Sequence, residues 1–383
     1  MSRTWPSRWQ KLWRDLQAER GRFALMLMAV AVSLGAFGAV LGAYAVLTRE
    51  IEANYLQTEP AHATLELPGD VDAAVLALAR RHPGVAGAEA RDVILARARV
   101  GNDWRPLLLF VVDEFSGLRL SRFTLEAGAA LPPTGGVMLE RTATGVLGAE
   151  AGGRLQLKTP NGALAEVPVS GLVHDPGLAP AWQERMGYAY LSRDTLKALG
   201  EDGRLHELRV RFQGVPETMA AVQAAATALG EDLQRQGVPV SEVRVPPPRQ
   251  HPHQRQMTTI LFVLLAFSLM ALLLSGVLVA NNLAALLARQ VREIGVMKTL
   301  GARTGQLAAM YLLLVAAIGL VSLALAMPMA YAGSRGFAFS VAALLNFTLG
   351  SSLPPAWVWA AQVLEGCWRR PWWPLCRCGV RAA

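Results

Sequence analysis

Residues 289–303 read RQVREIGVMKTLGAR and separate two long segments that contain no charged side chain. These uncharged segments are residues 257–288 and 304–334, and a third one, 23–48, lies near the amino terminus. Each of them exceeds the roughly 20 apolar residues that a helix needs to cross a hydrocarbon core. The sequence therefore predicts an α-helical membrane protein with three clear transmembrane helices.

The first apolar segment follows a basic stretch, as a secretory signal peptide does. Ala43 and Ala45 have the spacing of a cleavage site. The segment is nevertheless far longer than the roughly 7–15 residues of a signal-peptide core. An uncleaved transmembrane helix is the better interpretation.

Basic side chains indicate the orientation of the chain. Residues 1–22 form a basic segment that contains Arg3, Arg8, Lys11, Arg14, Arg20 and Arg22. Residues 289–303 contain four further basic side chains. Short basic segments stay in the cytoplasm, whereas a long segment crosses regardless of its charge. We therefore expect the amino terminus and 289–303 inside and residues 49–256 outside, with Arg335 as an exception. The net charge of +8 then reflects topology and requires no nucleic-acid partner.

Residues 49–256 have the pattern of an inserted α+β domain. Alternating or β-rich runs predict strands at 63–67, 92–100, 105–112, 155–158, 163–173, 188–191, 205–212 and 241–245. Helices are expected from a cap at Asp70 to Arg81 and over 216–236. A boundary between two interleaved subdomains is expected near 210–215.

Catalytic, metal-binding and cofactor-binding patterns do not stand out in this sequence. His174-Asp175 invites an acid/base interpretation, although a turn is the simpler one. His251-Pro252-His253 could contact a metal, although a solvated linker is favoured. None of the four lysines follows a glycine, so the glycine-lysine pair of a phosphate-binding loop is missing. We expect any ATP and Mg²⁺ to bind a separate polypeptide.

The 289–303 segment predicts a short amphipathic helix. Gly301 follows Leu300 as a helix stop would. On a helical wheel the charged and apolar side chains separate imperfectly, because Val296 and Lys298 depart from the pattern. Periodicity alone leaves two interpretations open: a contact with another protein, or a helix that rests its basic face on anionic lipid.

Residues 292–302, REIGVMKTLGA, resemble the signature of FtsX-like ABC transporter permeases, which include MacB-type transporters. In that family the stretch forms a cytoplasmic coupling helix seated in a groove of an ATPase. The resemblance implies ATPase contacts at Arg289, Arg292, Glu293, Ile294, Gly295, Met297, Lys298, Leu300 and Gly301. Residues 144–157 more weakly resemble a stretch of MacB-type periplasmic domains, with Gly153-Arg154 in place of a Gly-Asp pair.

The carboxyl terminus departs from this family. An outer loop is expected at 335–355, and a fourth transmembrane helix begins at 356–366. The tail 367–383 then holds every cysteine of the chain, Cys367, Cys376 and Cys378, together with three tryptophans. We interpret this change of composition as a frameshift near residue 363. A genuine, unusual tail is the alternative.

The sequence thus predicts the permease subunit of an ABC transporter-type complex in the bacterial inner membrane. Its ATPase is a separate subunit, and the permease pairs with a second copy or a second permease. A periplasmic adaptor or a lipoprotein is a further expected partner. Lipoprotein or lipid release, peptide or drug efflux, and cell-wall hydrolase activation remain open. A two-span sensory receptor and an energy-independent anchor are the alternatives, although no output domain follows the second span.

Overall fold

A computed structural model describes residues 17, 19–252, 254–301 and 303–365. The chain divides into two compact units. The membrane unit holds Met1–Arg49, Gln256–Val341 and Leu349–Ala383, and the α+β unit holds Glu50–Arg255 and Ala342–Thr348. Most of the basic segment 1–22 and all of the tail 367–383 lie outside the described residues. The proposed frameshift therefore remains a prediction.

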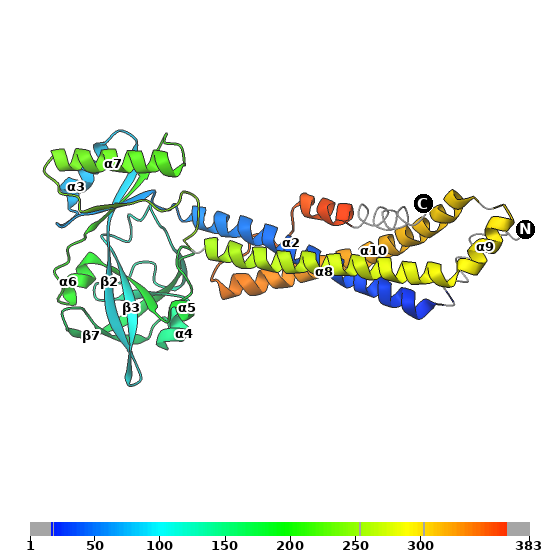
Figure 1. Ribbon diagram of the computed structural model, residues 1–383. Coiled ribbons are helices and arrows are strands. Elements are labelled where there is room, and N and C mark those ends of the chain that lie inside the picture. Colours follow the sequence, from blue (N-terminus) through cyan, green and yellow to red (C-terminus); the bar gives the residue numbers. More distant parts are fainter. Residues whose placement is uncertain (1–16, 18, 253, 302, 366–383) are drawn as a thin grey trace, which may run out of the picture. The chain divides into compact units, whose positions relative to one another are not determined.

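Three helices of the described residues are long and apolar enough to cross a membrane, as predicted. They are α2 (Arg20–Gln57), α8 (Gln254–Arg289) and α10 (Thr304–Leu344), with the short helix α9 (Val291–Thr299) between the last two (Figure 1). Each extends beyond its apolar segment, because charged and polar side chains continue the helix outside the hydrocarbon. A further helix covers 356–365. Together with the α+β sheet, these helices confirm the predicted fold class.

The three long helices pack through apolar side chains and close backbone contacts. Met26 and Val30 of α2 form one buried cluster with Val279 of α8 and Ile318 of α10. An ideal Cβ at Gly333 of α10 would lie 2.8 Å from Ala39 Cβ of α2. Small residues at such positions let two membrane helices approach closely.

Helix α10 extends past the expected end of the third span into the predicted 335–355 loop. The Arg335 guanidinium lies 5.5 Å from the ring centroid of Phe339, one helical turn later. This cation–π pair and the helix-forming residues that follow extend α10 to Leu344. The non-helical part of the loop spans 345–355.

The described part of the α+β unit contains one ten-stranded mixed sheet. Its order is β10-β1-β9-β2-β3-β8-β5-β7-β4, and β6 pairs with both β2 and β7. The strands are β1 (Ala63–Glu66), β2 (Val85–Val100), β3 (Asp103–Val112), β4 (Thr124–Gly128), β5 (Val137–Glu140), β6 (Arg154–Lys158), β7 (Leu164–His174), β8 (Gly187–Ser192), β9 (Glu207–Phe212) and β10 (Glu242–Arg244). The pairs β3–β8 and β5–β7 are parallel.

The helices of this unit gather at two ends of the sheet. Figure 1 shows α3 (Ala73–Arg81) and α7 (Met219–Arg235) at one end, with α4 (Ala143–Leu147), α5 (Ala181–Glu184) and α6 (Arg193–Ala198) at the other. One buried cluster runs from Leu65 of β1 through Leu109 of β3 to Leu157 of β6. The expected division into two subdomains near 210–215 is therefore not seen, because the sheet and its core are continuous.

The predicted helix cap at Asp70 needs correction. The N-cap of α3 is Asp72, whose carboxylate accepts a hydrogen bond from the Val75 amide at 2.9 Å. Asp70 instead accepts from the Leu205 amide at 2.9 Å and pairs with Arg193 at 2.9 Å. It therefore fixes the chain before β9 and does not cap the helix.

Candidate functional site

Helix α9 is set off from α8 by a single turn residue, Gln290. The Tyr311 hydroxyl of α10 donates a hydrogen bond to Gln290 Oε1 at 2.6 Å. The Ile294 amide bonds the Gln290 carbonyl oxygen at 2.9 Å and starts the new helix. Ile294 also packs, half-buried, against a cluster that includes Leu286 and Tyr311. The start of α9 is thus held by both of its neighbouring helices.

The end of α9 is an abrupt stop. Leu300 caps the helix, and Gly301 follows with φ of +94°. The Gly301 amide bonds the Lys298 carbonyl oxygen at 3.0 Å. A left-handed residue after a helix is the usual place for glycine, because a side chain there is strained. The predicted helix stop at Gly301 is confirmed.

The surface of α9 combines exposed apolar and charged side chains. None of its residues is buried, and the exposed fractions are 64% at Val291, 54% at Val296 and 83% at Leu300. Arg292 and Lys298 lie exposed on the same short helix. An exposed surface of this mixed kind is typical of a protein contact.

The structure places the predicted contact residues at both ends and along the length of α9. Arg289 is the last residue of α8 and lies 3.7 Å from the Glu19 carboxylate before α2. Ile294 and Met297 are half-buried. The remaining predicted residues are exposed: Arg292, Glu293, Gly295, Lys298, Leu300 and Gly301. Val291 is apolar but is not packed in the chain.

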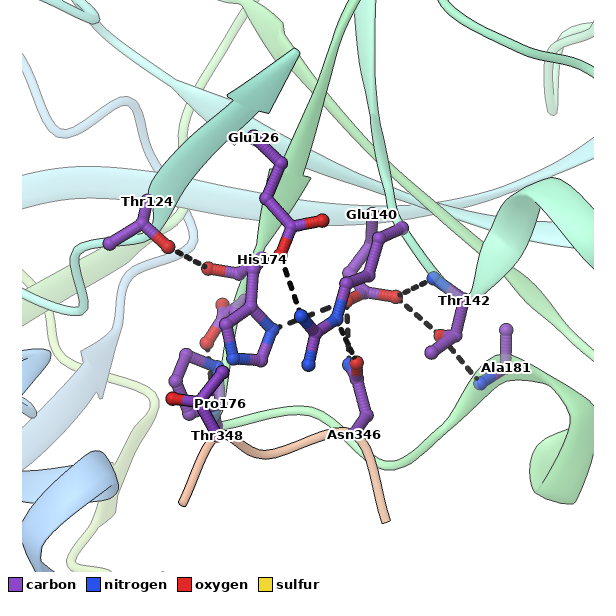
Figure 2. A network of polar contacts seen from close by, with 12 residues as sticks. Thr124, Glu126, Glu140, Thr142, His174, Pro176, Ala181, Asn346 and Thr348 are labelled. Atoms are coloured by element: carbon purple, nitrogen blue, oxygen red, sulfur yellow. Dashed lines mark hydrogen bonds and ion pairs between the residues drawn. The ribbon is translucent and has the colours of Figure 1, made fainter. Parts of the chain in front are cut away.

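A second feature, not predicted from the sequence, is a buried polar network in the α+β unit (Figure 2). Its centre is Glu140 at the end of β5, a carboxylate with no exposed surface. Glu140 Oε1 accepts from Asn346 Nδ2 at 2.6 Å, and Oε2 accepts from the Thr142 amide at 2.7 Å and from its hydroxyl. The Thr142 hydroxyl in turn accepts from the Ala181 amide at 3.0 Å.

The electrostatics of this network centre on the Glu140 carboxyl group. Burial favours a raised pKa for this carboxyl, but its contacts with His174, Thr142 and Asn346 hold the pKa below the ordinary value. The His174 Nδ1 atom lies 3.9 Å from Glu140 Oε1, which is too long for a hydrogen bond. Glu140 is thus an ionised, buried carboxylate whose partners come from segments far apart in the sequence.

The structure places Asp175 at a turn, as expected, but His174 at the end of a strand, and it corrects the interpretation of His251 as part of a solvated linker. His174 ends β7 and is 4% exposed, and Asp175 is 9% exposed. Asp175 accepts from the Tyr190 hydroxyl at 2.5 Å and from the Gly177 amide at 2.8 Å, so it is a buried turn residue. The His251 ring lies 2.6 Å from the Pro176 carbonyl oxygen and packs edge-on against Tyr55, so it is not in a solvated linker.

Among the described residues, no group of three or more His, Cys, Asp or Glu side chains lies in an arrangement that could hold a metal ion. The exposed surface of α9, which carries most of the predicted contact residues, is the stronger candidate for a functional contact.

Comparison with known proteins identifies the class of this membrane protein. Residues 265–364 match the FtsX-like permease C-terminal family. The match covers most of α8, all of α9 and α10, and the helix that begins at residue 356. This part of the chain is similar to FtsX-like permeases, in agreement with the family predicted from residues 292–302.

Two solved structures are similar to the chain. One is the extracellular domain of the noncanonic ABC-type transporter YknZ from Gram-positive bacteria, with 13% identity, a TM-score of 0.34, and coverage of 47% of this chain and 100% of that one. The other is the periplasmic region of MacB from Actinobacillus actinomycetemcomitans, with 12% identity, a TM-score of 0.34, and coverage of 55% and 97%. No curated protein matches the chain.

Proposed function

We propose that this chain is the permease subunit of an ABC-type complex and that a separate ATPase docks on α9. The observation that carries the proposal is the exposed, short helix between α8 and α10, which holds the family signature REIGVMKTLGA. Its charged residues offer ion pairs and its exposed apolar residues offer contact area, as at a protein interface. ATP and Mg²⁺ would bind the partner ATPase.

The position of α9 also suits mechanical coupling. The helix is joined to α8 through Gln290 and to α10 through Gly301, and Ile294 packs on both neighbours. A displacement of α9 by a closing ATPase would therefore act on two membrane helices at once. We propose that this displacement changes the position of the α+β unit outside the membrane, where cargo is moved or released.

The proposal includes a topology and an assembly. The basic residues support a cytoplasmic position for the amino terminus and α9 in a bacterial inner membrane, with 49–256 on the outer side. Two copies, or this chain and a second permease, would pair with two ATPase subunits. The cargo class is left open among lipids or lipoproteins, exported peptides or drugs, and cell-wall hydrolases.

A bulky substitution on α9 tests the docking proposal. A Cβ placed at Gly295 meets no atom within 4 Å, so Gly295→Trp fits the chain but obstructs a docked partner. Gly145→Trp on α4 is the matched control, because Gly145 is also helical and also faces open space. The tagged chains would be purified from gently solubilised membranes and their partners identified by mass spectrometry.

The expected result is a nucleotide-binding ATPase that copurifies with the wild type and with Gly145→Trp but is lost from Gly295→Trp. Equal recovery of the ATPase with all three chains would move the contact away from α9. No ATPase with any chain would favour a helix that rests on lipid, or the receptor and anchor alternatives.

A further inference from the structure

Residues 342–348 belong to the α+β unit, although they follow a membrane helix in the sequence. Helix α10 runs without a break to Leu344, across the division between Val341 and Ala342. The chain thus crosses between the two units four times: within α2, in the first turn of α8, near the end of α10, and after Thr348. Only the first two of these crossings were expected from the sequence.

Asn346 fixes the chain at the end of α10 through two side-chain hydrogen bonds. Its side-chain Nδ2 donates to Glu140 Oε1 at 2.6 Å, and its Oδ1 accepts from Arg141 Nε (Figure 2). Only 3% of Asn346 is exposed. A side-chain amide can donate to a carboxylate and accept from a guanidinium at the same time.

Both partners of Asn346 are themselves fixed. Glu140 is held by Thr142, as described above, and the Arg141 guanidinium pairs with Glu126 of β4 at 2.6 Å. Asn346 has φ of +60°, a conformation that asparagine tolerates better than most residues. The side chain therefore occupies a prearranged site, and its backbone turns the chain out of α10.

The neighbouring residues add to the attachment. The Thr348 hydroxyl lies 2.9 Å from Asn54 Oδ1, and the Asn54 amide donates to the Thr348 carbonyl oxygen at 2.8 Å. Phe347 is 7% exposed, and its amide bonds the Ala342 carbonyl oxygen at 3.1 Å. Residues 346–348 are thus attached through one buried amide, one buried ring and one pair of exposed hydrogen bonds.

We propose that Asn346 is a positioning residue that holds the end of α10 and the turn after it, residues 342–348, in the α+β unit. This attachment is independent of the proposed function, since it requires no ATPase.

Chemical labelling of a buried cysteine measures whether the attachment is fixed. The test uses the full chain with Cys367, Cys376 and Cys378 replaced by serine and with Phe347→Cys as the reporter. A maleimide reacts with residue 347 only when the segment opens, so the labelling rate reports the open fraction. The comparison variant is Asn346→Gly, which keeps the left-handed backbone accessible while it removes both side-chain hydrogen bonds.

Labelling of Phe347→Cys is expected to rise on the order of tenfold or more in Asn346→Gly, because two hydrogen bonds to charged groups are lost. Leu65→Cys in the core of the sheet is the control, since Leu65 has no exposed surface and its labelling should stay slow in both chains. An unchanged rate at residue 347 would overturn the proposal and leave ATPase docking untouched.

If Asn346→Gly also accelerates labelling of the Leu65→Cys control, Arg141→Lys is the variant that tests the attachment. Lysine keeps the charge but lacks the planar guanidinium that reaches Asn346 and Glu126 together. A rise of several-fold at residue 347, with the control unchanged, is the expected result. Equal labelling in wild type and Arg141→Lys would then reject the attachment.

Discussion

A methyl group added at Gly333 meets α2 directly, whereas one added at Gly336 of the same helix meets open space. The ideal Cβ at Gly333 lies 2.8 Å from Ala39 Cβ, and that at Gly336 has no atom within 4 Å. Neither atom at the Gly333 contact can rotate away, since both are Cβ atoms. The pair Gly333→Ala and Gly336→Ala therefore isolates the packing of α10 on α2.

The magnitude follows from two opposing effects. Replacing glycine by alanine inside a helix stabilises it by up to about 1 kcal/mol in both variants. Overpacking at a tight contact costs about 1–3 kcal/mol, and only Gly333→Ala incurs it. We therefore expect the free energies of unfolding of the two variants to differ by about 1–3 kcal/mol, with Gly333→Ala the less stable.

The assay is reversible unfolding of the full chain in mixed micelles of a mild detergent and sodium dodecyl sulfate, followed by circular dichroism. Equal free energies of unfolding for Gly333→Ala and Gly336→Ala would refute the close packing of α2 on α10.

Three other outcomes follow from the α+β unit and α9. Burial raises the pKa of Asp175, so ionisation of this carboxyl destabilises the fold as pH rises above the ordinary pKa of 3.8. The melting temperature of Asp175→Asn relative to wild type should therefore increase from about pH 4 to about pH 7. A difference in melting temperature that stays constant with pH would contradict this sign. Thr142→Ala removes the hydroxyl contacts to Glu140 and to the Ala181 amide and should lower the free energy of unfolding by about 1–3 kcal/mol, measured by thermal unfolding. Thr142→Ser should lower it less, and equal losses in the two variants would assign the effect to the methyl group. Leu300→Asp should leave the melting temperature unchanged, because Leu300 is 83% exposed, while ATPase copurification falls; a large loss of stability would mean that Leu300 packs inside the chain.

The membrane helices were predictable because their signal is local. An uncharged apolar run longer than about 20 residues predicts a membrane-spanning helix. The REIGVMKTLGA signature likewise lies in one continuous stretch of sequence. The stop of α9 at Gly301 was visible for the same reason. The larger strands were also found, although β2 begins at Val85 and is much longer than the predicted run from residue 92.

Missed elements depend on contacts between distant residues. β5 is only four residues long and fully buried, so no alternation marks it. β4 is exposed throughout and contains a register shift. The Glu140–Asn346 contact joins residues that are 206 positions apart, and no local pattern announces it. Asp175 is likewise buried beside Tyr190 of β8, from which it accepts a hydrogen bond, and this burial could not be predicted from the His174-Asp175 pair alone.

Site-specific photo-crosslinking tests the central claim, ATPase docking on α9, most directly. A photoreactive amino acid would replace Val296 of α9, and Val263 of α8 would serve as the control, since their exposed fractions are similar at 54% and 45%. The account predicts that residue 296 crosslinks to a nucleotide-binding ATPase in membranes and that residue 263 does not. Crosslinks from residue 296 only to lipid, or equal ATPase crosslinking from both positions, would contradict it.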